Sequence, residues 1–210
     1  MLYGVLKPLV VFLMRVWFGL RVRGAEHIPS SGPALIVSNH QSLLDPPAIG
    51  GAARRQIYFL AKAELFRIPL CGWLFRTLHA RPVRREGSDP RALRTAALLL
   101  EEGKALLIFP EGTRSLDGRL GEGKPGVGML AITSGAPVVP AYVSGTLEAL
   151  PKGAGWPRRS QVSVSFGPAL HFKAPISVGR KESYREAVEE MMRGIAQLRE
   201  QSDTIHSADH

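Results

Sequence analysis

A histidine and an aspartate five residues apart are the strongest candidates for chemistry in this sequence. His40 and Asp45 lie in the segment NHQSLLD (39–45), directly after a compact apolar run. A histidine at the end of a strand is held by the scaffold and stays open to substrate, and a carboxylate that holds its Nδ1 proton makes Nε2 a usable general base. Asp45 is also followed by Pro46, a pattern typical of a helix N-cap with proline in the first turn. Spacing alone leaves both roles of Asp45 open.

A second candidate segment, FPEGTRS (109–115), also follows an apolar run. Gly112 permits close backbone approach, and the guanidinium of Arg114 together with exposed backbone N–H groups suits an anionic headgroup. A carboxylate at Glu111 would repel a phosphate unless it binds a hydroxyl or orients a cation. The alternative is a charged turn in which Glu111 pairs with Arg114.

Lys124 is a further candidate for phosphate contact. It ends a G-x-x-x-x-G-K pattern at 118–124, but Pro125 stands where a phosphate-binding loop needs serine or threonine. The overlapping G-x-G-x-x-G match follows a polar loop and also contains Pro125, so neither motif is accepted. Lys124 is then either a point charge for a phosphate or a solvated loop lysine.

The net charge of the chain favours an anionic partner. A formal charge of +9 and a pI near 10.2 leave nucleic acid, an acidic lipid surface and phosphorylated small molecules open. Arg81, Arg84 and Arg85 form a basic cluster that is either a solvated face or a contact for phosphate or anionic lipid. The cluster has no aromatic residue at its centre, so nucleic acid is not an expected partner.

Strand-like and helical segments alternate along the 210 residues. Compact apolar runs predict buried strands, and these runs are 20–23, 33–38, 56–60, 104–109, 137–144 and 161–166. A helix is predicted over 90–102, with Pro90 in its first turn and Gly103 after its end, and an amphipathic helix begins near Ser183. The alternation predicts a single α/β domain, and one cysteine, Cys71, fits a reducing compartment.

The two ends of the chain differ in composition from the predicted domain at 21–200. Residues 1–20 are nearly all apolar, but Lys7, Pro8 and Arg15 interrupt them, so we expect a helix that lies in the membrane interface rather than one that spans it. A buried core helix is the alternative. Residues 201–210 have little to bury and are predicted to form a disordered tail.

Together these segments resemble the glycerophospholipid acyltransferase family, and in particular the small bacterial 1-acylglycerol-3-phosphate acyltransferases. The resemblance rests on four blocks in the expected order: NHQSLLD (39–45) for N-H-x-x-x-x-D, PVRR (82–85), FPEGTRS (109–115) and VVP (138–140). The first and third blocks are highly specific. The second block is the loosest, since either Arg84 or Arg85 could face the ligand, and we favour Arg85.

The resemblance implies a role for each matched residue. His40 would be the base and Asp45 its orienting partner, and the glycerol phosphate would be bound by Arg85, Glu111, Gly112, Thr113, Arg114 and Lys124. It also implies an α/β fold with a mixed, largely parallel central sheet flanked by helices, and an N-terminal membrane-docking segment at 1–20. No metal and no cofactor are expected.

The implied activity is transfer of a fatty acyl group to the sn-2 hydroxyl of lysophosphatidic acid, giving phosphatidic acid in phospholipid biosynthesis. The donor would be acyl-CoA or acyl-carrier protein, and the place would be the cytoplasmic face of the cell membrane, with a monotopic or peripheral attachment to anionic lipids. Relatives of this kind also acylate other lysophospholipids, so the acceptor stays open. The alternative from a different functional class is a non-enzymatic module that binds anionic lipid. That interpretation does not explain the His40 segment or FPEGTRS.

Overall fold

Seven strands of the described chain form one mixed sheet. The computed structural model describes residues 2–67, 72–73, 76–77, 79–83, 90–173 and 179–208, so Cys71, Arg84 and Arg85 lie outside the described residues. The strands are β1 (Arg21–Arg23), β2 (Ala34–Ser38), β3 (Ile57–Lys62), β4 (Ala80–Val83), β5 (Ala105–Ile108), β6 (Val138–Ser144) and β7 (Ser163–Phe166). Their order across the sheet is β1-β7-β6-β2-β5-β3-β4, and every neighbouring pair is parallel except β6 with β7. The predicted α/β fold with a largely parallel sheet is confirmed.

The centre of the sheet is β2, whose five residues are all buried. It pairs in parallel with β5 on one side and β6 on the other, with Val37 opposite both Ile108 and Pro140. A strand covered on both faces needs a continuous apolar run, which is the reason that 33–38 reads so clearly as a strand. Because the three strands run the same way, their carboxyl ends meet at one edge, and ligands of open α/β sheets bind outside that edge.

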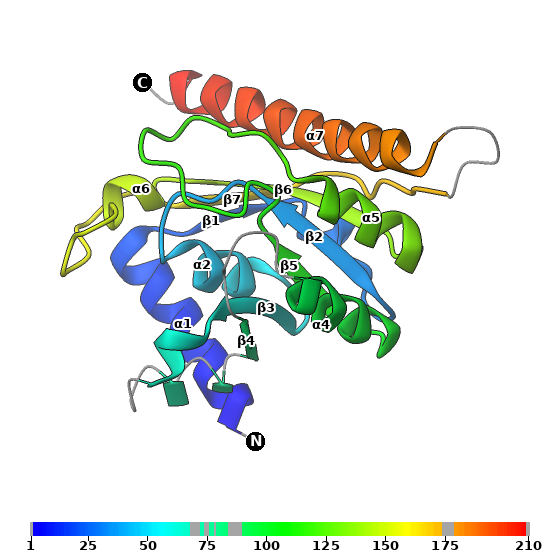
Figure 1. Ribbon diagram of the computed structural model, residues 1–210. Coiled ribbons are helices and arrows are strands. Elements are labelled where there is room, and N and C mark those ends of the chain that lie inside the picture. Colours follow the sequence, from blue (N-terminus) through cyan, green and yellow to red (C-terminus); the bar gives the residue numbers. More distant parts are fainter. Residues whose placement is uncertain are drawn as a thin grey trace.

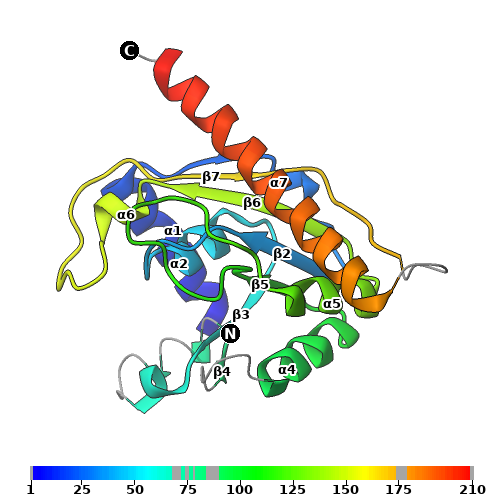
Figure 2. The same ribbon diagram turned by 45° about the horizontal axis from the view of Figure 1, so that its top comes forward.

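Helices cover both faces of the sheet (Figures 1 and 2). On one face, α1 (Leu2–Phe18) and α2 (Asp45–Ala52) pack on the side chains that β2, β5 and β6 direct toward them. On the other face lie α4 (Pro90–Glu101), α5 (Pro125–Ser134) and α7 (Arg180–Ala208). The remaining elements are the short α6 (Thr146–Ala149) and the 3₁₀ turns η1 (Ala25–His27) and η2 (Ala63–Arg67).

Helix α1 packs one side on the protein and leaves the other exposed. Met14 and Phe18 are buried in the core, and the ammonium group of Lys7 donates hydrogen bonds to the backbone oxygens of Ala53 (2.8 Å) and Arg55 (3.0 Å), just after α2. Partial burial lowers the pKa of Lys7. Among the described residues, no helix is both long and apolar enough to span a bilayer. Membrane docking by residues 1–20 stays a prediction.

The structure adds elements that the sequence did not suggest, among them β4, α5 and the short α6. In α5, glycines lower intrinsic helix propensity, but packing on α7 compensates for them. A Cβ at Gly128 would come within 2.0 Å of the backbone oxygen of Tyr184, so only glycine allows the two helices to approach this closely.

The predicted boundary of the tail at 201 needs correction. Helix α7 continues to Ala208, and Ser202 is buried against the protein. Thr204 donates to the backbone oxygen of Glu200 (2.9 Å), and Arg199 pairs with Asp203 one turn further along. Once a helix is nucleated, each added residue gains a hydrogen bond at little further cost, so a polar end can continue it.

Candidate active site

His40 and Asp45 are in direct contact at the carboxyl edge of β2. The Nδ1 atom of His40 lies 2.8 Å from the Oδ2 atom of Asp45, whose side chain is fully buried. This contact fixes the proton on Nδ1 and leaves Nε2 as the ring nitrogen for a substrate hydroxyl. The alternative role of Asp45 as a helix cap is not found, because Leu44 is the N-cap of α2 and the printed donors to the Asp45 carboxylate all lie outside that helix.

The Asp45 carboxylate accepts four hydrogen bonds. Besides His40, its Oδ2 atom accepts from the backbone N–H groups of Gln41 (2.7 Å) and Ser42 (2.8 Å). The hydroxyl of Thr146 donates to Oδ1 over 2.6 Å. Four donors around one carboxyl group match an ionised, acceptor-only carboxylate, and they fix its position beneath the histidine ring.

Thr146 was not singled out from the sequence. It is fully buried in α6, which follows β6 at the same edge of the sheet. Its oxygen accepts a hydrogen bond of 3.0 Å from the amide of Gln41, which also donates to the backbone oxygen of Val143 (3.0 Å). The hydroxyl therefore serves as acceptor and donor at once. The only signal in the sequence is a threonine just after a predicted strand, which is too common to identify a site.

Asn39 ties the histidine turn to the neighbouring strand. Its side-chain amide donates to the backbone oxygen of Val143 (2.9 Å), and its Oδ1 atom accepts from the Val143 N–H (2.8 Å). The asparagine side chain thus makes the pair of bonds that a strand backbone would make. This pairing prolongs the contact between the β2 and β6 segments up to His40.

The ring of His40 is also held from the side by Phe109. The two rings are stacked, with centroids 3.9 Å apart and planes inclined by 12°. Phe109 follows β5 and is buried. Stacking on one side and the Asp45 contact at Nδ1 together restrict both the tilt and the rotation of the imidazole, so Nε2 has a defined direction.

The third block holds the main chain of His40 at two points. The Oε1 atom of Glu111 accepts a hydrogen bond of 3.0 Å from the His40 N–H, and the Ser115 N–H donates to the His40 oxygen over 2.7 Å. The other carboxylate oxygen of Glu111 accepts from the Gly121 N–H (3.0 Å). Both oxygens of Glu111 therefore have partners within the protein, and its role in binding glycerol phosphate stays a prediction.

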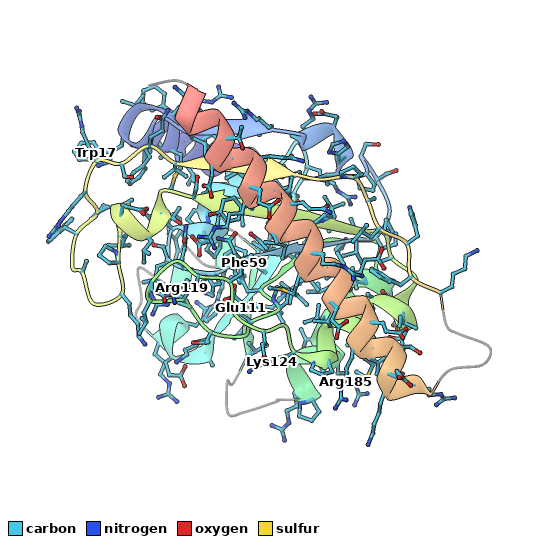
Figure 3. All side chains as sticks on the ribbon, turned by 90° about the horizontal axis from the view of Figure 1, so that it is seen from above. Trp17, Phe59, Glu111, Arg119, Lys124 and Arg185 are labelled. Atoms are coloured by element: carbon cyan, nitrogen blue, oxygen red, sulfur yellow. The ribbon has the colours of Figure 1, made fainter. Side chains whose placement is uncertain are left out.

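Gly112 and Lys124 lie next to each other beyond Glu111. Gly112 has a positive φ of 68°, and a Cβ there would lie 2.8 Å from the Lys124 ammonium nitrogen. The backbone N–H of Lys124 donates to the oxygen of Pro110 (2.9 Å), which holds the two loops together. Figure 3 shows Glu111 and Lys124 in the same region of the molecule, close to α7.

The residues between Glu111 and Ser115 are more exposed than Glu111 itself. Thr113 is exposed and Arg114 is half-buried. In the part of the chain that the structure describes, no ion pair joins Glu111 to Arg114, so the alternative of a turn held by that pair is not found. The predicted site residues His40, Asp45, Glu111, Gly112, Thr113, Arg114 and Lys124 gather at one edge of the sheet.

The second block reaches the same edge through β4. This strand pairs in parallel with β3 and ends at Val83, so the chain leaves the sheet on the side where His40 lies. Arg84 and Arg85 follow, outside the described residues. The choice between them stays open.

A protein-family model matches more than half of the chain. Residues 19–144 match the family model described as Acyltransferase. This range contains all four motif blocks, the central strands β2, β5 and β6, and His40 with Asp45.

Similar proteins carry a consistent name. A 1-acyl-sn-glycerol-3-phosphate acyltransferase of Bacillus subtilis is 30% identical over 189 residues, which are 89% of this chain and 92% of that protein. The Pseudomonas aeruginosa protein of the same name is 35% identical over 202 residues, which are 90% of this chain and 76% of that protein. A chloroplastic relative from Arabidopsis thaliana is 36% identical over 155 residues, 68% of this chain, but the matched region is only 43% of that longer protein.

A solved structure has the same fold. The crystal structure of the 1-acyl-sn-glycerophosphate acyltransferase from Thermotoga maritima superposes with a TM-score of 0.75 and 32% sequence identity. The match covers 94% of this chain and 81% of that chain. The likeness therefore extends over nearly the whole molecule.

Proposed function

Since the chain belongs to the acyltransferase family, we propose that it transfers a fatty acyl group from a thioester to the sn-2 hydroxyl of 1-acylglycerol-3-phosphate. The product would be phosphatidic acid. The observation that carries the proposal is the 2.8 Å contact between His40 and Asp45, which prepares a general base at the ligand-binding edge of an α/β sheet. The bacterial relatives that match most of this chain are named for this reaction.

In the proposed step, Nε2 of His40 takes the proton of the acceptor hydroxyl as its oxygen attacks the thioester carbonyl. The resulting imidazolium is stabilised by the Asp45 carboxylate. When the tetrahedral intermediate collapses, the carbon–sulfur bond breaks and the thiolate takes the proton from His40. General-base assistance of this kind contributes about 10²–10⁴-fold to the rate, and no acyl-enzyme is needed.

The phosphate of the acceptor would lie against the loop that follows β5. The proposed contacts are the guanidinium of Arg114, the ammonium group of Lys124 and the backbone around Gly112 and Thr113. Gly112 supports this assignment, because the absence of a Cβ leaves room for the Lys124 amine. Arg85 would add a second guanidinium from the end of β4. A phosphate held here would keep the acceptor hydroxyl near His40.

The acceptor and product are lipids, so the enzyme would work at a membrane surface. We place residues 1–20 in the interface of the cytoplasmic face, with α1 lying along it. The donor would be acyl-CoA or acyl-carrier protein. The exposed apolar side of α1 and the net charge of +9 both support attachment to anionic lipid.

The experiment is an acyl-transfer assay with a labelled acyl thioester in detergent micelles. Acyl-CoA and acyl-carrier protein are each offered with lysophosphatidate and, separately, with a lysophospholipid that carries a larger headgroup. We expect labelled phosphatidate from lysophosphatidate and little product from the other acceptor. Efficient acylation of only the other acceptor would contradict the proposed substrate, and no transfer with any pair would contradict the proposed reaction.

A further inference from the structure

The loop between α6 and β7 carries the most exposed large hydrophobic side chain that the structure describes. Trp156 is 86% exposed and lies in the segment PKGAGWPRRS (151–160). Exposing an aromatic side chain of this size to water is unfavourable, and where such a side chain is part of a larger apolar patch, the patch marks an interaction site. The loop is distant in sequence from the apolar residues 1–20.

In space this loop lies beside α1. The guanidinium carbon of Arg159 is 5.2 Å from the centroid of the Trp17 ring, and the backbone N–H of Val162 donates to the oxygen of Phe18 (2.8 Å). Figure 3 shows Trp17 next to the yellow loop, and Figures 1 and 2 both place that loop on the side of the molecule where α1 ends.

Helix α1 offers an apolar stripe on its exposed side. The spacing of these residues is i, i+3, i+4, i+7 and i+8, which aligns them on one face of a helix. Each is at least 49% exposed, and they are Leu9, Phe12, Leu13, Val16 and Trp17. The opposite side of α1 already packs on the sheet, so this stripe has no covering element among the described residues.

The loop adds positive charge to this apolar surface. Lys152, Arg158 and Arg159 are exposed, and no acidic residue occurs from 150 to 160. Tryptophan prefers the headgroup depth of a bilayer, and basic side chains beside it reach anionic headgroups. Basic side chains beside an apolar surface favour an anionic lipid bilayer as the partner.

The residues just before this loop are attached to the turn that carries His40. The hydroxyl of Ser42 donates to the backbone oxygen of Leu150 over 2.8 Å, and Thr146 in α6 bonds to Asp45. Leu43, in the His40 turn itself, is half exposed. A bilayer under α1 and the loop would therefore meet the protein close to the proposed base.

We propose that the loop 151–160 and the apolar stripe of α1 form a single surface that docks on an anionic bilayer, with Trp156 in the headgroup region. The inference rests on the proposed membrane attachment of residues 1–20 and extends it to a second segment. Trp156 acts as the apolar anchor of the loop, and Arg158 and Arg159 contact lipid phosphates.

Tryptophan fluorescence tests the position of the loop directly. The chain has three tryptophans, so the variant with Trp17→Phe and Trp73→Phe reports on Trp156 alone. Its emission is measured with vesicles of phosphatidylcholine, with and without phosphatidylglycerol, and with brominated acyl chains as quencher. The matched control replaces all three tryptophans by phenylalanine and carries Leu98→Trp on α4, an exposed position on the opposite face of the sheet.

We expect the emission of Trp156 to shift to the blue and to be quenched on vesicles with phosphatidylglycerol, while the reporter at Leu98 does not change. Unchanged Trp156 emission on protein that sediments with the vesicles would overturn this inference and leave attachment through α1 intact. If the protein does not bind these vesicles at all, both are wrong, and the acyl-transfer assay in micelles still tests the reaction separately.

A second measurement tests the arginines. Each basic residue at an anionic surface contributes about fivefold to binding, so Arg158→Gln with Arg159→Gln should weaken vesicle binding by about 25-fold. The control, Arg94→Gln with Arg185→Gln, removes the same charge from exposed positions on α4 and α7. Equal weakening by the two double variants would show that only the net charge matters and would overturn the proposed role of the loop.

Discussion

The backbone N–H of His40 donates a hydrogen bond of 3.0 Å to the Oε1 atom of Glu111. Through this bond a residue of the loop after β5 fixes the main chain at the proposed base, which follows β2. Glu111 also binds the N–H of Gly121, so one carboxylate joins the His40 turn to the loop that contains Lys124. This arrangement suggests that Glu111 positions His40, whereas the family resemblance implies that it binds the acceptor.

Replacing Glu111 by glutamine separates these two roles. In Glu111→Gln, an NH₂ group replaces one of the two carboxylate oxygens. One of the two backbone N–H groups, that of His40 or that of Gly121, therefore loses its acceptor. If Glu111 positions His40, kcat should fall by up to about 10²-fold with little change in the KM for lysophosphatidate. Steady-state kinetics with the exposed neighbour variant Glu122→Gln as control checks this. A raised KM with an unchanged kcat would instead support contact with the acceptor.

Thr146 is expected to be needed for the orientation of Asp45. In Thr146→Val the shape of the side chain is kept, but Asp45 loses one of its four donors and the Gln41 amide loses an acceptor. We expect the free energy of unfolding to fall by about 2 kcal/mol. The fold-decrease in kcat should be larger than the fold-change in KM.

The conservative variant Thr146→Ser serves as the control, since it keeps the hydroxyl. It should retain most of the activity and the stability, measured by steady-state kinetics and by chemical denaturation. If the valine variant matched the wild type in kcat, the hydroxyl of Thr146 would have no part in positioning the base.

Gly112→Ala is expected to disturb the position of Lys124. The φ of 68° is unfavourable for any residue with a Cβ and costs about 1–2 kcal/mol. The new Cβ would also lie 2.8 Å from the Lys124 ammonium nitrogen and displace it. The KM for lysophosphatidate should rise, as measured in the micelle assay.

Gly50→Ala provides a comparison for this change, because Gly50 has an ordinary φ and open space around it. It should lose neither stability nor affinity. An unchanged KM in Gly112→Ala would indicate that Lys124 does not bind the acceptor phosphate.

His79 should make the protein less stable in mild acid. Burial, followed by the charges of Arg81 and Lys104, lowers the pKa of His79 from 6.5. Well above pH 6.5 both the folded and the unfolded states hold this histidine neutral, so it causes no pH dependence there. As the pH falls below 6.5, the unfolded state binds a proton first, and stability is lost until the pH has passed the folded-state pKa.

The variant His79→Asn tests this, since asparagine tolerates the positive φ of 62° at this position. Thermal unfolding on both sides of pH 6.5 should show a smaller loss of Tm in the variant than in the wild type. Identical pH dependence in the two proteins would refute the assignment to His79.

The sequence was a good guide where local pattern and packing agree. The run 33–38 predicts a buried strand because β2 is covered on both faces, and Pro90 and Gly103 mark the two ends of α4. Helix α5 was missed for the opposite reason. Its glycines lower the helix propensity of the segment. Contacts in the folded protein explain them, since a Cβ at Gly128 would meet Tyr184 of α7 and a Cβ at Gly126 would meet Leu93 of α4.

The site was predictable in part. The spacing of His40 and Asp45 suggested a catalytic pair. The family resemblance assigned the segment 109–115 to the same site. Thr146 lies 101 residues from Asp45, and no periodicity or motif connects the two. They meet because β6 runs parallel to β2, so the residue after one strand lies beside the residues after the other. Contacts of that kind follow from the order of strands in the sheet, which spacing along the chain does not reveal.

The most direct test of the proposed mechanism is the rate of acyl transfer to lysophosphatidate in His40→Ala, beside the wild type and His171→Ala. His171 is exposed and follows Leu170, which bridges Val138 at the first residue of β6, so it lies at the edge of the sheet opposite His40 and its variant should keep wild-type activity. The loss of the base should lower kcat in His40→Ala by about 10²–10⁴-fold while the protein keeps its fold. Wild-type turnover in His40→Ala would contradict the assignment of His40 as the general base.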